Sequence, residues 1–198
     1  MQMPFDSLTE LSDDALLALF ANGDAGAARA LTLRFTPRAL AHAQRVLGDA
    51  AEAEDVAQEA MMRLWRMAPD WRPGEAQLGT WLYRVVANLC TDRLRKRRTV
   101  DIDSLPEWAD NAPSADARLQ QQQRAAALQQ ALMHLPDRQR QAVVLRHIEG
   151  LANPQIATIL GVGVEAVESL TARGKRALGR LLLGRRAELG FDDDQNEQ

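Results

Sequence analysis

The sequence contains a single cysteine, Cys90, and only three histidines among its 198 residues. One thiol cannot form a disulfide within the chain, and so few thiols and imidazoles give no plausible zinc-binding set. No apolar run approaches the roughly 20 residues that a membrane-spanning helix needs, and the first ten residues lack the apolar stretch of a signal peptide. We therefore expect a soluble, cytoplasmic protein without a metal and without membrane contact.

Aromatic residues are also scarce, at 5% of the chain, and Val and Ile are few and scattered. The chain is instead rich in Ala, Leu, Arg, Gln and Glu, which are mostly strong helix formers, and apolar residues make up 46% of it. This composition predicts an all-α protein with little or no sheet and with enough apolar side chains to bury a core.

The net charge of −3 argues against bulk attraction to nucleic acid. The charges are unevenly distributed, however, because basic residues gather at 93–98 and 173–186, whereas acidic residues gather at the N-terminus, at 101–110 and at 192–194. A single basic run is usually a solvated helix face. Two runs, each at the end of a separate helical segment, favour two confined contacts with DNA phosphates.

Capping residues and apolar spacing predict four helices in the first half of the chain, with Ser12 and Asp24 as N-caps of the first two. They are expected at residues 12–21, 24–47, 50–67 and 80–98. Pro37 lies inside the second helix, where it predicts a kink or a break. Residues 68–79 hold two prolines and two glycines and therefore predict a loop.

Acidic residues and prolines replace the Leu/Ala periodicity at residues 99–115, which predicts a linker between two domains. A helix is expected around the glutamine run at 120–123, and further helices are expected at 137–148, 153–160 and 164–183. Asn153 is the predicted N-cap of the 153–160 helix, with Pro154 at its first helical position.

Residues 155–170 have the pattern of a helix-turn-helix. Gly161, Val162 and Gly163 form the predicted turn, and the inward-facing side chains are expected to be Ile156, Ala157, Leu160, Val164, Val167 and Leu170. The second helix of such a motif can lie in the major groove and present its exposed side chains to base edges. The exposed positions include Glu168, Ser169, Thr171, Arg173, Lys175 and Arg176. The alternative is an ordinary helical hairpin with a basic end.

Aromatic side chains alternate with arginines around the start of the 80–98 helix. The residues are Trp71, Arg72, Trp81, Tyr83, Arg84 and Arg93. Single-stranded nucleic acid is held in this way, because bases stack on rings while cations follow the backbone. The alternative is that Trp81 and Tyr83 belong to the core, and for Trp81 alone we favour the core because tryptophan is mostly buried.

Asp55 and Glu59 lie four residues apart on one face of the 50–67 helix, together with Gln58. Paired carboxylates can bind a metal or perform acid–base chemistry, but no histidine, lysine or third carboxylate converges on them in the sequence. An acidic, glutamine-bearing face is more typical of a docking surface for a basic partner.

Together, these segments resemble the sigma-70 family and, within it, the small extracytoplasmic-function (ECF) group. Region two of the family resembles Gly48–Asn88, including Glu54-Asp55-Val56-Ala57-Gln58-Glu59-Ala60 and Thr80-Trp81-Leu82-Tyr83-Arg84. Region four resembles Leu135-Pro136-Asp137-Arg138-Gln139-Arg140, Glu149-Gly150-Leu151, Gln155-Ile156-Ala157 and Val164-Glu165-Ala166-Val167-Glu168-Ser169. The resemblance covers about residues 10–185. It implies region two at 10–98, a linker at 99–115, region four at 116–185 and an acidic tail at 186–198.

The resemblance also implies roles for particular residues. Asp55, Gln58 and Glu59 match the motif that binds the coiled coil of the β′ clamp of core RNA polymerase, and region four would meet the β flap. The implied contacts with the −10 element of promoter DNA are Trp71, Arg72, Trp81, Arg84, Asn88, Asp92, Arg93, Arg95 and Lys96. The implied contacts with the −35 element are Glu168, Ser169, Thr171, Arg173, Lys175 and Arg176. The linker would thread the polymerase near the RNA exit path.

The resemblance further implies control by an anti-sigma factor in a stress response. The sequence departs from the family at the turn before the recognition helix, where Gly163 stands in place of a common Ser. Glycine is an acceptable N-cap at a cost of a few tenths of a kcal/mol. Glu168 and Leu170 occupy positions where some members carry basic residues, which leaves the −35 sequence open.

Three other hypotheses fit parts of the sequence. A helix-turn-helix repressor or response-regulator output domain would explain residues 135–185 but would leave 54–59 and 81–92 without a role. A protein-binding helical adaptor would make the basic helices solvated faces. A metal-dependent enzyme is the weakest alternative, since the sequence has no metal set, catalytic triad or Walker motif. We therefore expect no enzyme activity, no cofactor and no small-molecule substrate.

Overall fold

The computed structural model describes residues 8, 10–100 and 116–183, and all regular structure in these ranges is helical. The elements are α2 (Asp13–Ala21), α3 (Ala25–Leu47), α4 (Ala50–Met67), the 3₁₀ turn η1 (Ala68–Asp70), α5 (Leu78–Val100), α6 (Asp116–Met133), α7 (Asp137–Val143), the π-helical turn η2 (Val144–Ile148), α8 (Asn153–Leu160) and α9 (Val164–Leu183). The all-α prediction is confirmed for these ranges. Residues 101–115 of the predicted linker and the acidic tail lie outside the described residues.

Side-chain caps start the first three long helices. The Ser12 hydroxyl accepts a hydrogen bond from the Ala15 amide at 3.2 Å, and the Asp24 carboxylate accepts one from the Ala27 amide at 2.9 Å. Asp49 caps α4 in the same way. These bonds satisfy amides that have no partner inside the helix. The two predicted caps, Ser12 and Asp24, are therefore confirmed.

The structure differs from the prediction in two details. Helix α3 has its predicted bounds but continues through Pro37 without a break. Pro37 is exposed, so water can solvate the carbonyl that loses its helical partner. Helix α5 begins at Leu78 rather than Thr80, because Leu78 is 2% exposed and joins the core. It also extends to Val100, so Thr99 and Val100 belong to this helix and not to the linker.

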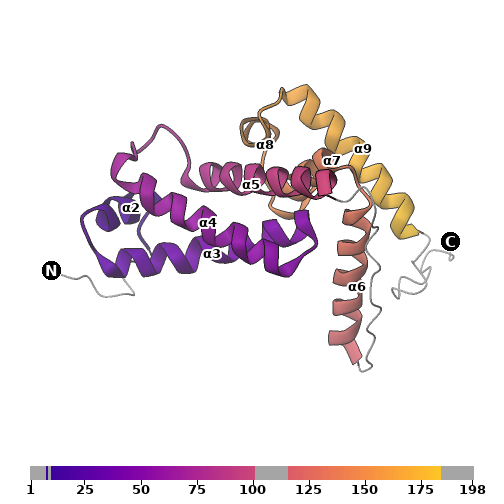
Figure 1. The fold of residues 1–198 in the computed structure, drawn as a ribbon, viewed down its shortest axis with the longest axis horizontal. Coiled ribbons are helices and arrows are strands. Elements are labelled where there is room, and N and C mark those ends of the chain that lie inside the picture. The colour runs from indigo at the N-terminus through magenta and orange to yellow at the C-terminus, as the bar shows by residue number, and fades with distance from the viewer. Residues whose placement is uncertain (1–7, 9, 101–115, 184–198) are drawn as a thin grey trace, which may run out of the picture.

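Helices α2 to α5 pack around one apolar core, which we call the N-terminal unit, residues 10–100. Phe35, Leu31, Leu64, Leu82 and Val86 lie in this core and are at most 1% exposed. Figure 1 shows α3, α4 and α5 lying side by side, with α2 at one end. Burial of these side chains supplies the main stabilisation of the unit.

Helices α6 to α9 form what we call the C-terminal unit, residues 116–183. Leu132, Leu135, Val143, Val144 and Leu178 form one small core. Helix α9 passes so close to α7 that a Cβ on Gly174 would lie 2.5 Å from a Val143 methyl group, which explains the glycine at that position.

The helix-turn-helix is present in α8 and α9, with three differences from the predicted details. Ala152 is the N-cap of α8, and Asn153 is the first helical residue. Ile159, which was not among the expected core residues, is 1% exposed, whereas Val164 is 40% exposed. Ile159 and Val167 therefore form the apolar contact between the two helices in place of Val164, because Val164, the first residue of α9, faces solvent.

The two units are packed against each other along α5. A second apolar cluster in the C-terminal unit, formed by Leu145, Ile156, Ile159 and Val167, is completed by Tyr83 and Ala87 of α5. Figure 1 shows α8 lying against α5 and the C-terminal helices grouped at that side of the molecule. No helix in the described ranges is both long and apolar enough to cross a membrane.

Candidate nucleic-acid interface

The predicted docking face of α4 carries Asp55, Gln58 and Glu59. Asp55 and Gln58 are exposed. Glu59 pairs with Arg63 at 2.8 Å, and Asp55 pairs with Arg93 of α5 at 3.3 Å. The hydrogen bond from Arg63 lowers the pKa of the Glu59 carboxyl, so this carboxylate is ionised at neutral pH. The face is therefore anionic, with two of its charges partly balanced by arginines of the same unit.

An apolar groove of about 310 Å³ runs beside this face, between α3 and α4. Its lining includes Leu40, Ala57, Met61, Met62 and Trp65, together with Gln58 of the acidic face. Met62 is 45% exposed, which is high for a large apolar side chain on a folded domain. Exposed methionine beside carboxylates suits an amphipathic partner with basic flanks.

The loop between α4 and α5 carries Trp71 and Arg72. The Trp71 indole donates a hydrogen bond to Asp14 of α2 at 2.8 Å, and the other oxygen of Asp14 accepts from the Gly74 amide at 3.3 Å. Arg72 is exposed and lies 3.6 Å from Glu75. Asp14 thus fixes the loop at two points, a role that no sequence signal indicated, since it joins residues about 60 positions apart.

The predicted aromatic platform is divided by the fold. Trp81 is half-buried against the N-terminal core. Tyr83 is 7% exposed and lies under the C-terminal unit, so it belongs to the core, as the alternative interpretation stated. Arg84 and Asn88 are exposed on α5. In this arrangement Tyr83 offers no free ring face to a base.

The basic run at the end of α5 is largely occupied by ion pairs within the chain. Arg95 pairs with Asp92 at 3.1 Å, Arg97 pairs with Glu52 at 2.9 Å, and Arg98 pairs with Asp137 of α7. Lys96 is exposed. The exposed pair of Arg95 contributes little stability, about 0–1 kcal/mol, so a phosphate group can displace it, whereas Arg97 is half-buried and also donates to the Leu47 carbonyl.

The predicted −35 residues lie on α9, and most of them face solvent. Glu168, Ser169, Arg173, Lys175 and Arg176 are exposed, and Thr171 is half-buried. The Thr171 hydroxyl donates to the Val167 carbonyl within the helix, which directs it away from a ligand. Glu168 accepts a hydrogen bond from Asn153 at 3.4 Å. Arg173, Lys175 and Arg176 form an exposed cationic strip on the helix-turn-helix, in which Arg173 also donates a hydrogen bond to the Ser169 carbonyl at 3.2 Å.

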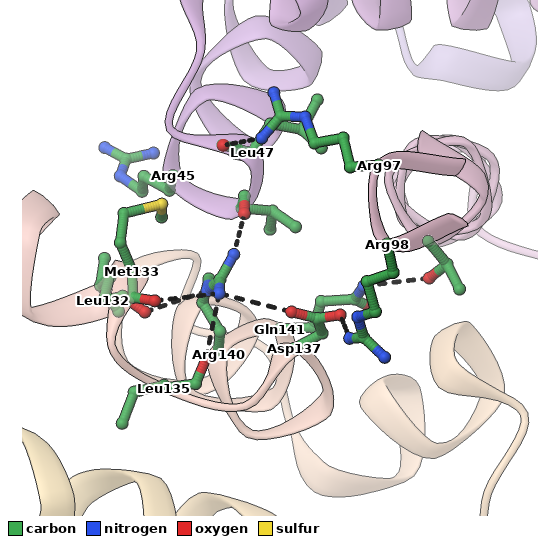
Figure 2. A network of polar contacts seen from close by, with 12 residues as sticks. Arg45, Leu47, Arg97, Arg98, Leu132, Met133, Leu135, Asp137, Arg140 and Gln141 are labelled. Carbon is green, nitrogen blue, oxygen red and sulfur yellow. Dashed lines mark hydrogen bonds and ion pairs between the residues drawn. The ribbon is translucent and has the colours of Figure 1, made fainter. Parts of the chain in front are cut away.

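Arg140 is a buried residue whose role the sequence did not indicate. It is 6% exposed, and its guanidinium donates to the carbonyl groups of Leu132, Met133, Leu135 and Val46. Figure 2 shows it at the centre of this network, between the α6–α7 turn and the end of α3. Burial, and the nearby Arg97 and Arg98, lower its pKa to about 10, so it stays charged at neutral pH.

Family models match both halves of the chain. The sigma-70 region 2 model matches residues 31–100, and the sigma-70 region 4 model matches residues 125–178. The RNA polymerase sigma-H factor of Pseudomonas aeruginosa is 32% identical over 186 residues, which cover 88% of this chain and 96% of that relative. The chain belongs to the sigma-70 family, as an ECF-type sigma factor.

Other relatives agree with this assignment. The ECF RNA polymerase sigma factor SigM of Mycobacterium tuberculosis is 36% identical over 178 residues, covering 90% of this chain and 88% of the relative. SigE of Mycolicibacterium smegmatis is 37% identical over 140 residues, and the match spans 69% of this chain but about half, 54%, of SigE. The family consists of transcription initiation factors, so the repressor, adaptor and enzyme hypotheses no longer apply to the chain as a whole.

Two solved structures have a similar fold. CnrH, determined in complex with the cytosolic domain of CnrY, has a TM-score of 0.65 and 28% identity, covering 87% of this chain and 97% of CnrH. The sigma factor RpoE of Bartonella quintana, determined with the anti-sigma factor NepR, has a TM-score of 0.60 and 25% identity, covering 77% of this chain and 94% of RpoE. Within the described ranges no group of His, Cys, Asp and Glu side chains is arranged to hold a metal ion.

Proposed function

We propose that this ECF sigma factor binds core RNA polymerase and directs promoter-specific initiation by binding the −35 duplex and capturing the −10 element. The observation that carries the proposal is the presence of both family regions, in order, with an anionic face on α4 and a cationic strip on α9. Two weak contacts held on one platform gain affinity through effective concentration. In this function region two spans residues 10–98 and region four spans residues 116–185.

The α4 face, with Asp55, Gln58 and Glu59, is the proposed contact with the β′ clamp. The apolar groove beside it extends the contact, because it adds area that excludes water around the carboxylates. Asp55→Ala or Gln58→Ala should weaken binding to core polymerase about tenfold, as expected for one interfacial polar contact. Glu10→Ala, which removes an exposed carboxylate outside α4, is the matched control. Equal affinity of all three variants would contradict the docking role.

Capture of the −10 element is proposed for the Trp71 loop and the adjoining face of α5. A cleft of about 700 Å³ opens there, lined by residues 74–80 together with Asp14, Arg38 and Leu151. Trapping an unstacked base in such a cleft offsets the few kcal/mol that unstacking costs, so melting needs no ATP. Trp71→Ala or Asn88→Ala should reduce permanganate reactivity of −10 thymines more than promoter binding. A proportional loss of both would contradict a role in opening.

The cationic strip of α9 is the proposed −35 contact, with Arg173, Lys175 and Arg176 toward the phosphates and base edges, while the rest of region four meets the β flap. Arg173→Ala should weaken −35 binding and reduce its salt dependence by about one phosphate contact. Arg29→Ala, at an exposed position on α3, removes the same charge from the N-terminal unit and is the control. An unchanged −35 footprint in Arg173→Ala would overturn this assignment.

Control by an anti-sigma protein in a stress response is also proposed, since the Bartonella RpoE was solved in complex with the anti-sigma factor NepR and CnrH with the cytosolic domain of CnrY. Run-off transcription with purified core polymerase on a library of genomic fragments tests the function directly. New transcripts that need this chain would establish the sigma role and yield both promoter elements. Failure to bind core polymerase would overturn the proposal.

A further inference from the structure

The loop at residues 71–77, between η1 and α5, has a fixed shape although most of it faces solvent. All residues from 72 to 77 are exposed, so burial does not order them. Two hydrogen bonds to the Asp14 carboxylate order the loop instead, one from the Trp71 indole at 2.8 Å and one from the Gly74 amide at 3.3 Å. Gly74 has a φ of 82°, in the left-handed region that favours glycine. We call this pair of hydrogen bonds the Asp14 bridge.

Asp14 belongs to a helix that is itself anchored to the rest of the unit. It lies in the first turn of α2, where the neighbouring Asp13 pairs with Arg34 of α3 at 2.6 Å. Leu16 and Leu17 of the same helix are fully buried in the N-terminal core. Because an ion pair and burial both hold α2, the Asp14 carboxylate sets the position of the loop relative to that core.

Trp71 is the fixed end of the loop. Its ring is half-buried against the N-terminal core. The indole N–H is the only side-chain donor of a tryptophan, and here it is bonded to Asp14. The indole therefore has no donor left for a base edge. Hydrogen bonds to a captured base must come from groups further along the loop or from the other walls of the cleft.

The loop supplies one wall of the cleft of about 700 Å³ that is proposed above for the −10 element, through residues 74–80. Tyr83 also lines this cleft, but its hydroxyl already donates to Glu149 at 2.6 Å. The shape that a base would meet is therefore set mainly by the backbone at 74–80. That backbone begins at Gly74, where the Asp14 bridge holds it.

A loop that is ordered before binding affects selectivity as well as affinity. It loses less conformational freedom when a ligand arrives than a mobile loop does. A wall of fixed shape also rejects a base that does not fit, whereas a mobile loop adapts to several bases. Loss of the Asp14 bridge should therefore reduce the discrimination between bases.

We propose that Asp14 is a positioning residue for −10 recognition, which holds the 71–77 loop through Trp71 and Gly74 in the shape that accepts one unstacked base and rejects others. Its use at a promoter rests on the function proposed above, whereas the Asp14 bridge is a property of the free chain. Asp14 precedes residue 31, at which the match to the sigma-70 region 2 model begins, so that match assigns it no role.

Amide hydrogen exchange at Gly74, followed by NMR on the full chain, tests the bridge without polymerase. Asp14→Ala should raise the exchange rate about tenfold, since a hydrogen bond to a charged group is worth about that much. Trp71→Phe, which keeps the carboxylate and a packed ring but removes the indole donor, should raise it in the same direction. Asp70→Asn, which removes an exposed carboxylate of η1, should leave the rate unchanged.

Trp71→Phe is the decisive variant, because Asp14→Ala also removes a charge beside the Gly74 amide and could unfold α2. A rise in Asp14→Ala without a rise in Trp71→Phe would reflect that local change alone and would overturn the bridge. Unchanged exchange in both variants would overturn it as well.

A promoter fragment obtained from the run-off experiment provides the second arm. An abasic site is placed in turn at each non-template position of the −10 element, and the yield of open complex is measured with core polymerase. The parent should lose about tenfold at the captured base, as for one mismatched base pair. In Asp14→Ala the loss at that position should largely disappear, while the losses at other positions persist.

A merely structural role of Asp14 would instead reduce opening by the same factor at every position. That result, or an unchanged pattern of losses, would overturn the positioning role. Absence of polymerase binding by the parent chain would contradict the proposed function, while the exchange rates of the free chain would still decide the Asp14 bridge.

Discussion

The N-terminal and C-terminal units are both helical, but they reach stability in different ways. Helices α2 to α5 enclose a large core that they supply themselves. The C-terminal unit has two small clusters, and one of them takes Tyr83 and Ala87 from α5. Small domains bury a smaller share of their surface and are correspondingly less stable. The stability of the C-terminal unit therefore depends on its contact with α5, whereas the N-terminal unit supplies its own core.

The helix caps repeat this contrast. Ser12, Asp24 and Asp49 cap the first three long helices with side-chain oxygens, whereas α7 and α8 begin after Pro136 and Ala152, which supply no side-chain cap. Local signals thus fix the N-terminal helices, and long-range contacts fix much of the C-terminal unit. The stability of the C-terminal unit therefore rests in part on its contacts with α5.

The largest effect is expected from the N-terminal core. Phe35 is fully buried, and Phe35→Ala should cost about 3–5 kcal/mol. Because the C-terminal unit rests on α5, both units should unfold earlier. The denaturation midpoints measured by tryptophan fluorescence and by far-UV circular dichroism should therefore fall together. Trp65, Trp71 and Trp81, which pack against the N-terminal core, contribute to the fluorescence.

Ile156→Ala is the matched change in the shared cluster, with an expected cost of about 2–5 kcal/mol. Here the circular dichroism should begin to fall at lower denaturant than the fluorescence, because the C-terminal unit is lost first. If both signals shifted together in both variants, the chain would unfold as one cooperative body. That result would contradict the difference in stability between the two units.

Arg140→Met removes the buried guanidinium that ties the α6–α7 turn to the end of α3 (Figure 2). Several buried carbonyl groups lose a charged donor, so the C-terminal unit should lose about 3 kcal/mol. The circular dichroism should show this loss and the fluorescence should not. Arg138→Met, at an exposed position of the same helix, should change stability by less than about 0.5 kcal/mol.

Acid should act on the junction between the units through His42. This residue is fully buried on α3, 5.5 Å from the Tyr83 ring, and neither ring nitrogen has a hydrogen-bond partner. Burial, and next the charge of Arg45, lower its pKa from 6.5 to about 3. The unfolded chain therefore takes up a proton first, and stability that is intact above pH 6.5 is lost as the pH falls toward 3.

The expected loss is about 1 kcal/mol per pH unit between pH 6 and 5. Denaturant titrations at pH 7, 6 and 5 measure it. His42→Leu should remove most of this slope, because His147, whose pKa is lowered by burial and by the nearby Lys175 and Arg146, keeps a smaller part of it. The variant should be at least as stable as the parent at pH 7, because an unsatisfied buried polar group disappears. His134→Gln, at an exposed site in the C-terminal unit, should keep the slope of the parent. A slope of undiminished size in His42→Leu would assign it to other groups.

The difference between local signals and long-range contacts also decides which features the sequence could predict. The bounds 50–67 of α4, the caps Ser12 and Asp24, and the turn at Gly161 follow from signals within a few residues, and the structure agrees with them. The family resemblance, carried by two local motifs, is likewise confirmed. Local periodicity and capping act over one or two helical turns, so a sequence displays them directly.

The docking of the units could not be predicted in this way. Tyr83 and Glu149 are 66 residues apart, and Arg140 reaches a carbonyl 94 residues away. The alternation of aromatics and arginines suits a base-stacking platform as well as a packed face, and only the position of the C-terminal unit assigns Tyr83 to the latter. Asn153 was predicted as the cap of α8 because its type favours caps, yet Ala152 has that position.

The smallest effect tests the difference in capping. Ala152 has an extended backbone, with φ −75° and ψ 150°, which suits a serine N-cap, and the Gln155 side chain already accepts a hydrogen bond from its amide. Ala152→Ser would add the missing half of a capping box and should stabilise the C-terminal unit by about 0.5–1 kcal/mol. The circular dichroism midpoint should rise while the fluorescence midpoint stays fixed. Ala126→Ser, at an exposed position inside α6, should instead lower stability slightly, because serine is a weaker helix former than alanine. If both serines lowered stability equally, helix propensity would outweigh capping in this unit, and the missing caps would not explain its dependence on α5.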